Sequence, residues 1–177
     1  KNPKKSSLLC RDITIGKKES LRKLNLHHKP ITVYLDKNFP LKINFITNEL
    51  NPIVQILDNN EIINKKIIRN FTEAQNLISS SRLVIAKPGY GIISECINFR
   101  CPIILITRKN YPEDELLCKS SKELGISTVL NLQEENNTIK IPTFSSQELK
   151  NKIKEKKIEK LGQLPHVTQI IEEFLYK

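Results

Sequence analysis

The sequence predicts an α/β domain in which about six parallel strands form one sheet with helices on both faces. Short runs rich in Val, Ile and Leu alternate along the chain with segments whose apolar residues recur at helical spacing. The run at residues 83–86 is wholly apolar, as expected for a central strand buried on both faces. With 177 residues, of which 38% are hydrophobic, the chain is long enough to bury the core of one domain.

The individual elements follow from β-branched composition and from the residues that begin and end helices. The predicted strands are residues 31–35, 53–57, 65–69, 83–86, 103–107 and 126–130. Helices are predicted at residues 20–24, 41–50, 74–79 after a Thr72 cap, from the turn at 87–91 to about Phe99, from Pro112 to Gly125, from Ser145 or Ser146 to Lys160, and at 167–176. Strands that alternate with helices form a largely parallel sheet.

The turn after strand 83–86 is the most informative stretch of the chain. Gly89 and Gly91 allow positive φ and let a ligand approach the backbone closely. The first amides of the following helix lack partners within it and lie at the positive end of its dipole. An anion, most often a phosphate, is therefore expected there. The alternative is an ordinary strand-to-helix turn in which the glycines only cap and connect.

This turn belongs to a longer series of motifs. Lys-Pro-Gly-Tyr-Gly-Ile-Ile-Ser-Glu at 87–95 is followed by Arg-Cys-Pro at 100–102, by a polar loop at 108–115 and by Glu-Leu-Gly-Ile at 123–126. Together they resemble the donor-binding, C-terminal domain of GT-B glycosyltransferases, in particular the family-28-like enzymes that include the UDP-N-acetylglucosamine transferase of peptidoglycan synthesis. The resemblance covers about residues 65–130 and implies a Rossmann-like half of a GT-B fold.

The resemblance also implies an activity and a division of the chain. The activity is transfer of a hexosyl or N-acetylhexosaminyl group from a nucleotide diphosphate sugar, expected to be a UDP-sugar, to an acceptor hydroxyl. Residues 1–29 would lead in from an acceptor domain, residues 30–162 would bind the donor, and residues 163–177 would form a C-terminal amphipathic helix that packs partly on the acceptor domain or wholly on its own. The catalytic base would come from the acceptor domain or a partner subunit, and no metal or other cofactor is implied.

Ligands of open α/β sheets bind at the carboxyl ends of strands, so the turns at 70–72, 87–95 and 107–115 are expected to gather at one edge. Amides of residues 89–92, with Lys87 beside them, suit a diphosphate. The resemblance assigns Glu95 to the ribose hydroxyls, residues 70–71 to the base and residues 114–115 to the donor sugar. The complete predicted donor-binding set is Asn70, Phe71, Lys87, Gly89, Tyr90, Gly91, Ile92, Ser94, Glu95, Arg108, Asp114 and Glu115.

Each of these assignments has a structural alternative. The carboxylates of Glu95, Asp114 and Glu115 are also favourable simply because they lie at the start of a helix. Arg108 could form a surface ion pair, and Tyr90 could cover the turn. Two other functions share the pattern: a sugar-nucleotide 2-epimerase of the same fold, and a non-catalytic donor-binding or scaffold subunit that works with a partner.

The charge of the chain limits the classes of partner that are expected. The chain has 29 Lys and Arg against 19 Asp and Glu, a net charge of +10 that favours the phosphates of a nucleotide or an anionic membrane surface, although dispersed lysines equally suit a solvated basic surface. No nucleic-acid motif is present, so nucleic acid is not an expected partner. The chain has no apolar stretch of about 18 residues. We therefore expect a cytoplasmic location, with the inner face of the membrane as a candidate contact.

The cysteines form no C-x-x-C pair and are expected to be reduced and mostly buried: Cys10, Cys96, Cys101 and Cys118.

Overall fold

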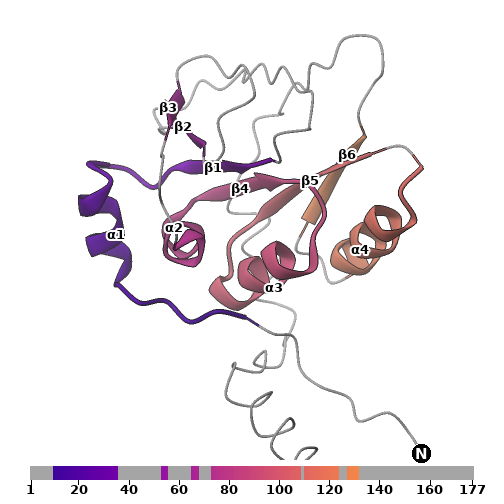
Figure 1. The fold of residues 1–177 in the computed structure, drawn as a ribbon, viewed down its shortest axis with the longest axis horizontal. Coiled ribbons are helices and arrows are strands. Elements are labelled where there is room, and N and C mark those ends of the chain that lie inside the picture. Colours follow the sequence, from indigo (N-terminus) through magenta and orange to yellow (C-terminus); the bar gives the residue numbers. More distant parts are fainter. Residues whose placement is uncertain are drawn as a thin grey trace, which may run out of the picture.

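The computed structural model describes residues 10–35, 53–55, 65–67, 73–108, 110–123 and 127–131, which are coloured in Figure 1. The strands in these ranges are β1 (Ile31–Tyr34), β2 (Ile53–Gln55), β3 (Lys65–Ile67), β4 (Leu83–Ala86), β5 (Ile103–Thr107) and β6 (Ser127–Asn131). The helices are α1 (Lys17–Lys23), α2 (Ala74–Ser80), α3 (Tyr90–Phe99) and α4 (Pro112–Glu123).

The strands form one six-stranded sheet with the order β3-β2-β1-β4-β5-β6, and every neighbouring pair is parallel. This is the strand order of the Rossmann fold. The chain builds outward from β1 to β3, then returns to the opposite side of β1 and continues outward through β4, β5 and β6. The predicted parallel α/β fold is confirmed, and its topological switch point lies between β1 and β4.

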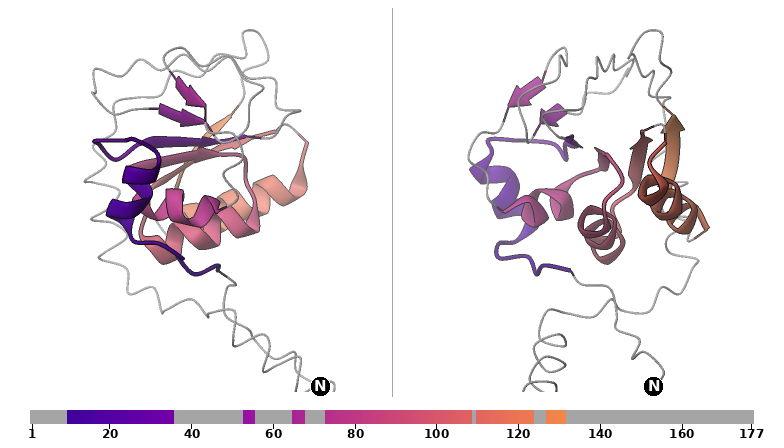
Figure 2. Two further views of the ribbon diagram at one scale, coloured as in Figure 1. Left: turned by 60° about the vertical axis from the view of Figure 1, so that its left-hand side comes forward. Right: turned by 45° about the vertical axis from the view of Figure 1, so that its right-hand side comes forward.

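Three helices cover one face of this sheet. Figure 2 shows α2, α3 and α4 along the same side of the strands, with α1 beside α2, and α2 packs against both α1 and α3. The helices predicted at 41–50, 145–160 and 167–176 lie outside the described residues.

Two helix starts differ from the sequence prediction. The helix expected at 20–24 already begins at Lys17, because extended Gly16 precedes it and Glu19 pairs with Arg22 one turn later at 2.9 Å. At α2 the N-cap is Glu73 rather than Thr72, although the Glu73 side chain makes no capping bond. Its carboxylate instead accepts a hydrogen bond from the Thr14 hydroxyl at 2.7 Å. The same oxygen also accepts a hydrogen bond from Asn76 Nδ2, so a local and a distant contact meet at the start of α2.

The core is centred on β4, as predicted. All four residues of β4 are buried. Val84 and Ala86 pack with Ile93 and Ile97 of α3, whereas Ile85, whose side chain alternates to the other face, is also fully buried. A strand buried on both faces needs the continuous apolar run that the sequence shows.

The four cysteines are free and buried, which confirms the sequence prediction. Cys96, Cys101 and Cys118 belong to the apolar cluster between the sheet and its helices. Burial raises the pKa of the Cys96 thiol well above its usual range, and burial raises that of Cys118 to about 11. These thiols are therefore protonated at neutral pH and serve as small apolar packing groups.

Candidate functional site

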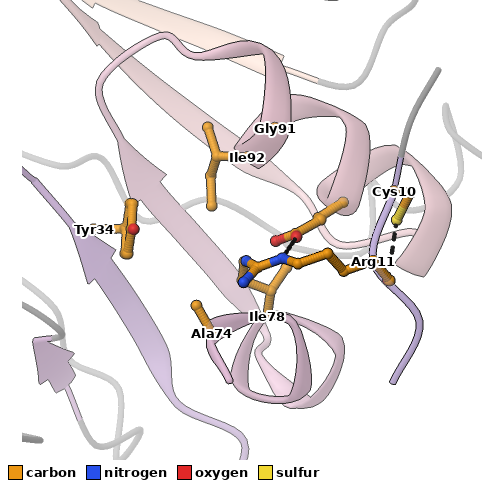
Figure 3. A pocket seen from close by; sticks show the side chains of 8 residues that line it. Cys10, Arg11, Tyr34, Ala74, Ile78, Gly91 and Ile92 are labelled. Atoms are coloured by element: carbon orange, nitrogen blue, oxygen red, sulfur yellow. Dashed lines mark hydrogen bonds and ion pairs between the residues drawn. The ribbon is translucent and has the colours of Figure 1, made fainter. Parts of the chain in front are cut away.

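A cavity of about 310 Å³ lies where β1 and β4 end (Figure 3). Tyr34 is the last residue of β1, and Ala74 is the first residue of α2. From the other side, Gly91 and Ile92 contribute the first turn of α3. The lining residues are Cys10, Arg11, Tyr34, Ala74, Ile78, Gly91, Ile92 and Glu95. The cavity thus lies at the carboxyl ends of the strands beside the switch point, the place where open α/β sheets bind ligands.

The glycine turn does not use the positive φ that glycine allows. Gly89, the N-cap of α3, has φ −166° and ψ 139°, which is ordinary extended backbone, and Gly91 is the second residue of the helix. The expectation of close approach to the backbone stays open, because a Cβ built on Gly91 would meet no described atom within 4 Å, and one on Gly89 would only touch Ile92 at 3.7 Å.

The start of α3 presents unused backbone donors. The amide of Ile93 donates to the Gly89 carbonyl at 3.1 Å, which is the first bond of the helix. The amides of residues 90–92 precede that bond and have no acceptor within the helix, and no side chain caps this end. Tyr90 is 49% exposed here. Ser94 is buried, and its hydroxyl donates to the Tyr90 carbonyl at 2.7 Å, so this side chain stabilises the first turn.

Glu95 lies one turn further along α3 and faces the cavity. Its side chain is only 5% exposed, and Oε1 accepts a hydrogen bond from Arg11 Nε at 2.6 Å. No donor among the described residues reaches its second oxygen, Oε2. The hydrogen bond with Glu95 raises the pKa of Arg11. The ion pair with Arg11 therefore holds the Glu95 carboxylate in a nearly buried place beside the cavity, and Oε2 has no hydrogen-bond donor among the described residues.

Nothing in the sequence singles out Arg11, which is one of 29 Lys and Arg residues in a basic chain. It reaches the cavity because its segment is anchored on α2 by Asn76. The fully buried Asn76 accepts hydrogen bonds from the amides of Thr14 at 2.9 Å and Ile15 at 3.4 Å, and donates to the Thr14 hydroxyl at 2.7 Å. Cys10, on the other side of Arg11, is buried. Long-range contacts thus fix the main chain on both sides of Arg11.

The loop between β5 and α4 is held by its own ion pair. The Asp114 side chain is 1% exposed and accepts hydrogen bonds from the Arg108 amide at 3.1 Å, from Nε at 3.1 Å and from Nη2 at 2.9 Å. The Arg108 guanidinium also stacks 3.7 Å above the centre of the Tyr111 ring. Burial by itself would raise the pKa of Asp114, but the hydrogen bonds from Arg108 outweigh it and the pKa lies below its usual value. This geometry favours the structural alternative for Asp114 and Arg108.

Only some of the predicted site residues lie at the cavity. Gly91, Ile92 and Glu95 line it, and residues 89–90 adjoin it at the start of α3. Lys87 follows β4, and its charge is a smaller cause of the lowered pKa of Asp114. Glu115 is exposed on α4. Asn70 and Phe71 lie outside the described residues.

The residues described above contain no group of three or more His, Cys, Asp or Glu side chains placed to hold a metal ion. They also contain no helix that combines the length and the apolar character needed to cross a membrane.

The strand order, the switch point and the cavity define a Rossmann-type α/β domain. Its candidate site offers helix amides for an anion and a carboxylate for ligand hydroxyl groups. No family model matches the sequence, and no curated protein matches it either. Three solved structures are similar in part. The glycosyltransferase SnogD from Streptomyces nogalater has a TM-score of 0.47 and 13% identity, and the match covers 73% of this chain and 40% of SnogD. The glycotransferase of kitacinnamycin has a TM-score of 0.40 and 16% identity, with 72% and 35% covered, and the glycosyltransferase VinC in complex with dTDP has a TM-score of 0.42 and 13% identity, with 74% and 34% covered. The chain matches 40% or less of each, and similarity at this level does not by itself assign a family.

Proposed function

We propose that this chain is the donor-binding domain of a GT-B glycosyltransferase and that it holds a nucleotide diphosphate sugar for transfer to an acceptor hydroxyl. One observation carries the proposal: the uncapped start of α3 and the carboxylate of Glu95 meet in a single cavity at the switch point of a Rossmann-type sheet. The motif at residues 87–95, which resembles the family-28-like transferases, is the segment that forms this half of the cavity.

The diphosphate is expected at the start of α3. Its oxygens can accept hydrogen bonds from the amides of residues 90–92, at the positive end of the helix dipole. The open space over Gly91 leaves room for a phosphate close to the backbone. Because the nucleotide diphosphate leaves with negative charge, donors fixed in this place stabilise the transition state as well as the bound donor.

The ribose is expected beside Glu95. A carboxylate oxygen accepts two hydrogen bonds, which suits the two neighbouring hydroxyls of a ribose. Oε2 of Glu95 is the oxygen that no described donor occupies. Of the two carboxylates proposed for the donor sugar, Glu115 is exposed, whereas Asp114 uses its oxygens to hold Arg108. We therefore retain Glu115 as the proposed sugar contact and assign Asp114 to the shape of the loop.

Catalysis would need a second component. No base for the acceptor hydroxyl is proposed from the described residues, and the resemblance places that base in an acceptor domain or partner subunit. The isolated chain is therefore expected to bind the donor and to transfer little sugar. Incubation of the complete enzyme with labelled UDP-sugars distinguishes the functions: a glycosylated acceptor with UDP supports transfer, whereas an epimerised sugar nucleotide or an unchanged donor contradicts it.

Calorimetric titration with UDP tests the site itself. We expect Glu95→Ala to weaken UDP binding by about 1 to 3 kcal/mol, the range for a lost hydrogen bond to a charged group, without unfolding the domain. Glu113→Ala is the matched control, because Glu113 is also a carboxylate in the first turn of a helix but is exposed on α4. Circular dichroism checks the fold of both variants. Unchanged affinity in folded Glu95→Ala, or no binding of UDP, GDP or TDP by the parent chain, would contradict the proposal.

A further inference from the structure

We infer that Arg11 is a positioning residue for nucleotide recognition: it holds one oxygen of Glu95 so that the other faces the ribose. The inference rests on the proposed function, because it assumes that Glu95 binds the ribose hydroxyls. It adds a residue 84 positions earlier in the chain, outside the motif that suggested the site.

The geometry of the pair supports positioning. Arg11 approaches from the segment before α1, and Figure 3 shows its side chain entering the cavity between Ile78 of α2 and Ile92 of α3. Its Nε lies 2.6 Å from Oε1 of a carboxylate that is 5% exposed. Glu95 has no other hydrogen-bond partner among the described residues, so within that part of the chain Arg11 is the group that orients its carboxylate. Two vicinal hydroxyls are bound well only when the accepting oxygen is held in place.

The side chain of Arg11 is suited to this role because its own support is rigid. Buried Cys10 precedes it, and the bonds between Asn76 and Thr14 follow it. The Nε–H of arginine points in a fixed direction in the guanidinium plane, whereas the ammonium of lysine is a point charge on a flexible stem. Arg11→Lys therefore keeps the positive charge but removes the donor that orients Glu95.

The measurable consequence is discrimination between UDP and 2′-deoxy-UDP, which differ only in the 2′-hydroxyl, one of the two hydroxyls that Glu95 would bind. The parent chain should prefer UDP by about tenfold or more, the ratio for one hydrogen bond to a charged group. Affinities of both nucleotides are measured by calorimetry for Arg11→Gln, Arg11→Lys, Glu95→Gln and the double variant Arg11→Gln with Glu95→Gln. Arg22→Gln is the control, because Arg22 also pairs with a glutamate but lies on exposed α1. Circular dichroism confirms that each variant is folded.

If Arg11 positions Glu95, both Arg11 variants lower the UDP preference at least about threefold, toward that of Glu95→Gln, and the double variant loses no more than Glu95→Gln alone. Arg22→Gln keeps the parent preference. The inference is overturned if folded Arg11 variants keep the parent preference while Glu95→Gln loses it. It is equally overturned if they weaken both nucleotides by the same factor, because Arg11 would then act on the phosphates or on the fold. If the parent chain binds neither nucleotide, the proposed function itself fails.

Discussion

Asn76→Ala should destabilise the domain by releasing the segment that carries Arg11. The side chain of Asn76 is fully buried and bonds the amides of Thr14 and Ile15 and the hydroxyl of Thr14. Its Nδ2 also donates to the carboxylate of Glu73, the N-cap of α2. Alanine removes these bonds but keeps the main chain, whose carbonyl accepts hydrogen bonds from Ser20 at 3.3 Å and Ser80 at 2.8 Å. The substitution therefore removes the anchor of the segment together with one bond at the start of α2.

The magnitude follows from the individual bonds. The two short bonds to Thr14 and the bond to the Glu73 carboxylate should contribute about 1 kcal/mol each, and the bond to Ile15, at 3.4 Å, much less. Thr14 is exposed, so water can replace part of what it loses. The expected loss is about 2 kcal/mol in the free energy of unfolding, which for a domain of this size corresponds to a fall of about 4 to 8 °C in Tm.

Urea denaturation followed by circular dichroism measures the loss, and a thermal melt gives the shift in Tm. Lys119→Ala is the control, because Lys119 is exposed on α4, away from this anchor, and should change the stability by less than about 0.5 kcal/mol. An Asn76→Ala protein as stable as the parent would refute the reasoning, because the segment from Cys10 to Ile15 would then not depend on these bonds.

Two further predictions concern the helix starts that follow β4 and β5. Asp114→Asn should cost about 1 to 3 kcal/mol in urea denaturation, because the bonds from Arg108 lose their charged acceptor, whereas Glu115→Gln should be neutral. The folded pKa of Asp114 lies below its unfolded value of 3.8, so its contribution is present above that pH and is lost as pH falls through the folded value. As the pH falls, the free energy of unfolding should therefore decrease more steeply for the parent than for Asp114→Asn. Parallel plots of this free energy against pH for the two proteins would contradict this. Gly91→Ala should stabilise α3 by about 0.5 to 1 kcal/mol, because its Cβ meets no described atom, and yet weaken UDP binding by obstructing the phosphate. Equal UDP affinity in the folded variant would argue against a phosphate at this turn.

The fold could be predicted because its signals are local. Strand β4 is a continuous apolar run, and the break at residues 87–89 marks where α3 begins, so the central strand and helix were located correctly. Pro112 likewise marks the start of α4. The alternation of such segments is enough to predict a parallel sheet. The strand order was not predicted, because right-handed crossovers limit the possible arrangements without selecting one of them.

The site was only partly predictable because its contacts are not local. Glu95 could be selected from its motif, but its partner Arg11 is 84 residues away and lies in an ordinary basic segment. The bonds between Thr14 and Asn76, which bring Arg11 to the cavity, span 62 residues and leave no periodic pattern. The motif also does not indicate whether a glycine is present for its φ or for the space above it, and here Gly89 is extended. The hydrogen bonds from Arg108 to Asp114 are likewise not indicated by the motif, which suggested only a donor contact for Asp114.

The most direct test of the account is a UDP titration of the isotopically labelled chain followed by amide NMR. We expect saturable shifts concentrated in the amides of residues 89–92 and in Glu95, because these groups would contact the diphosphate and the ribose. Glu95→Gln should reduce the affinity while leaving the shifts at residues 89–92 in place, because the helix amides remain. No saturable shift at the start of α3, or shifts confined to another face of the sheet, would contradict the claim that this cavity binds a nucleotide.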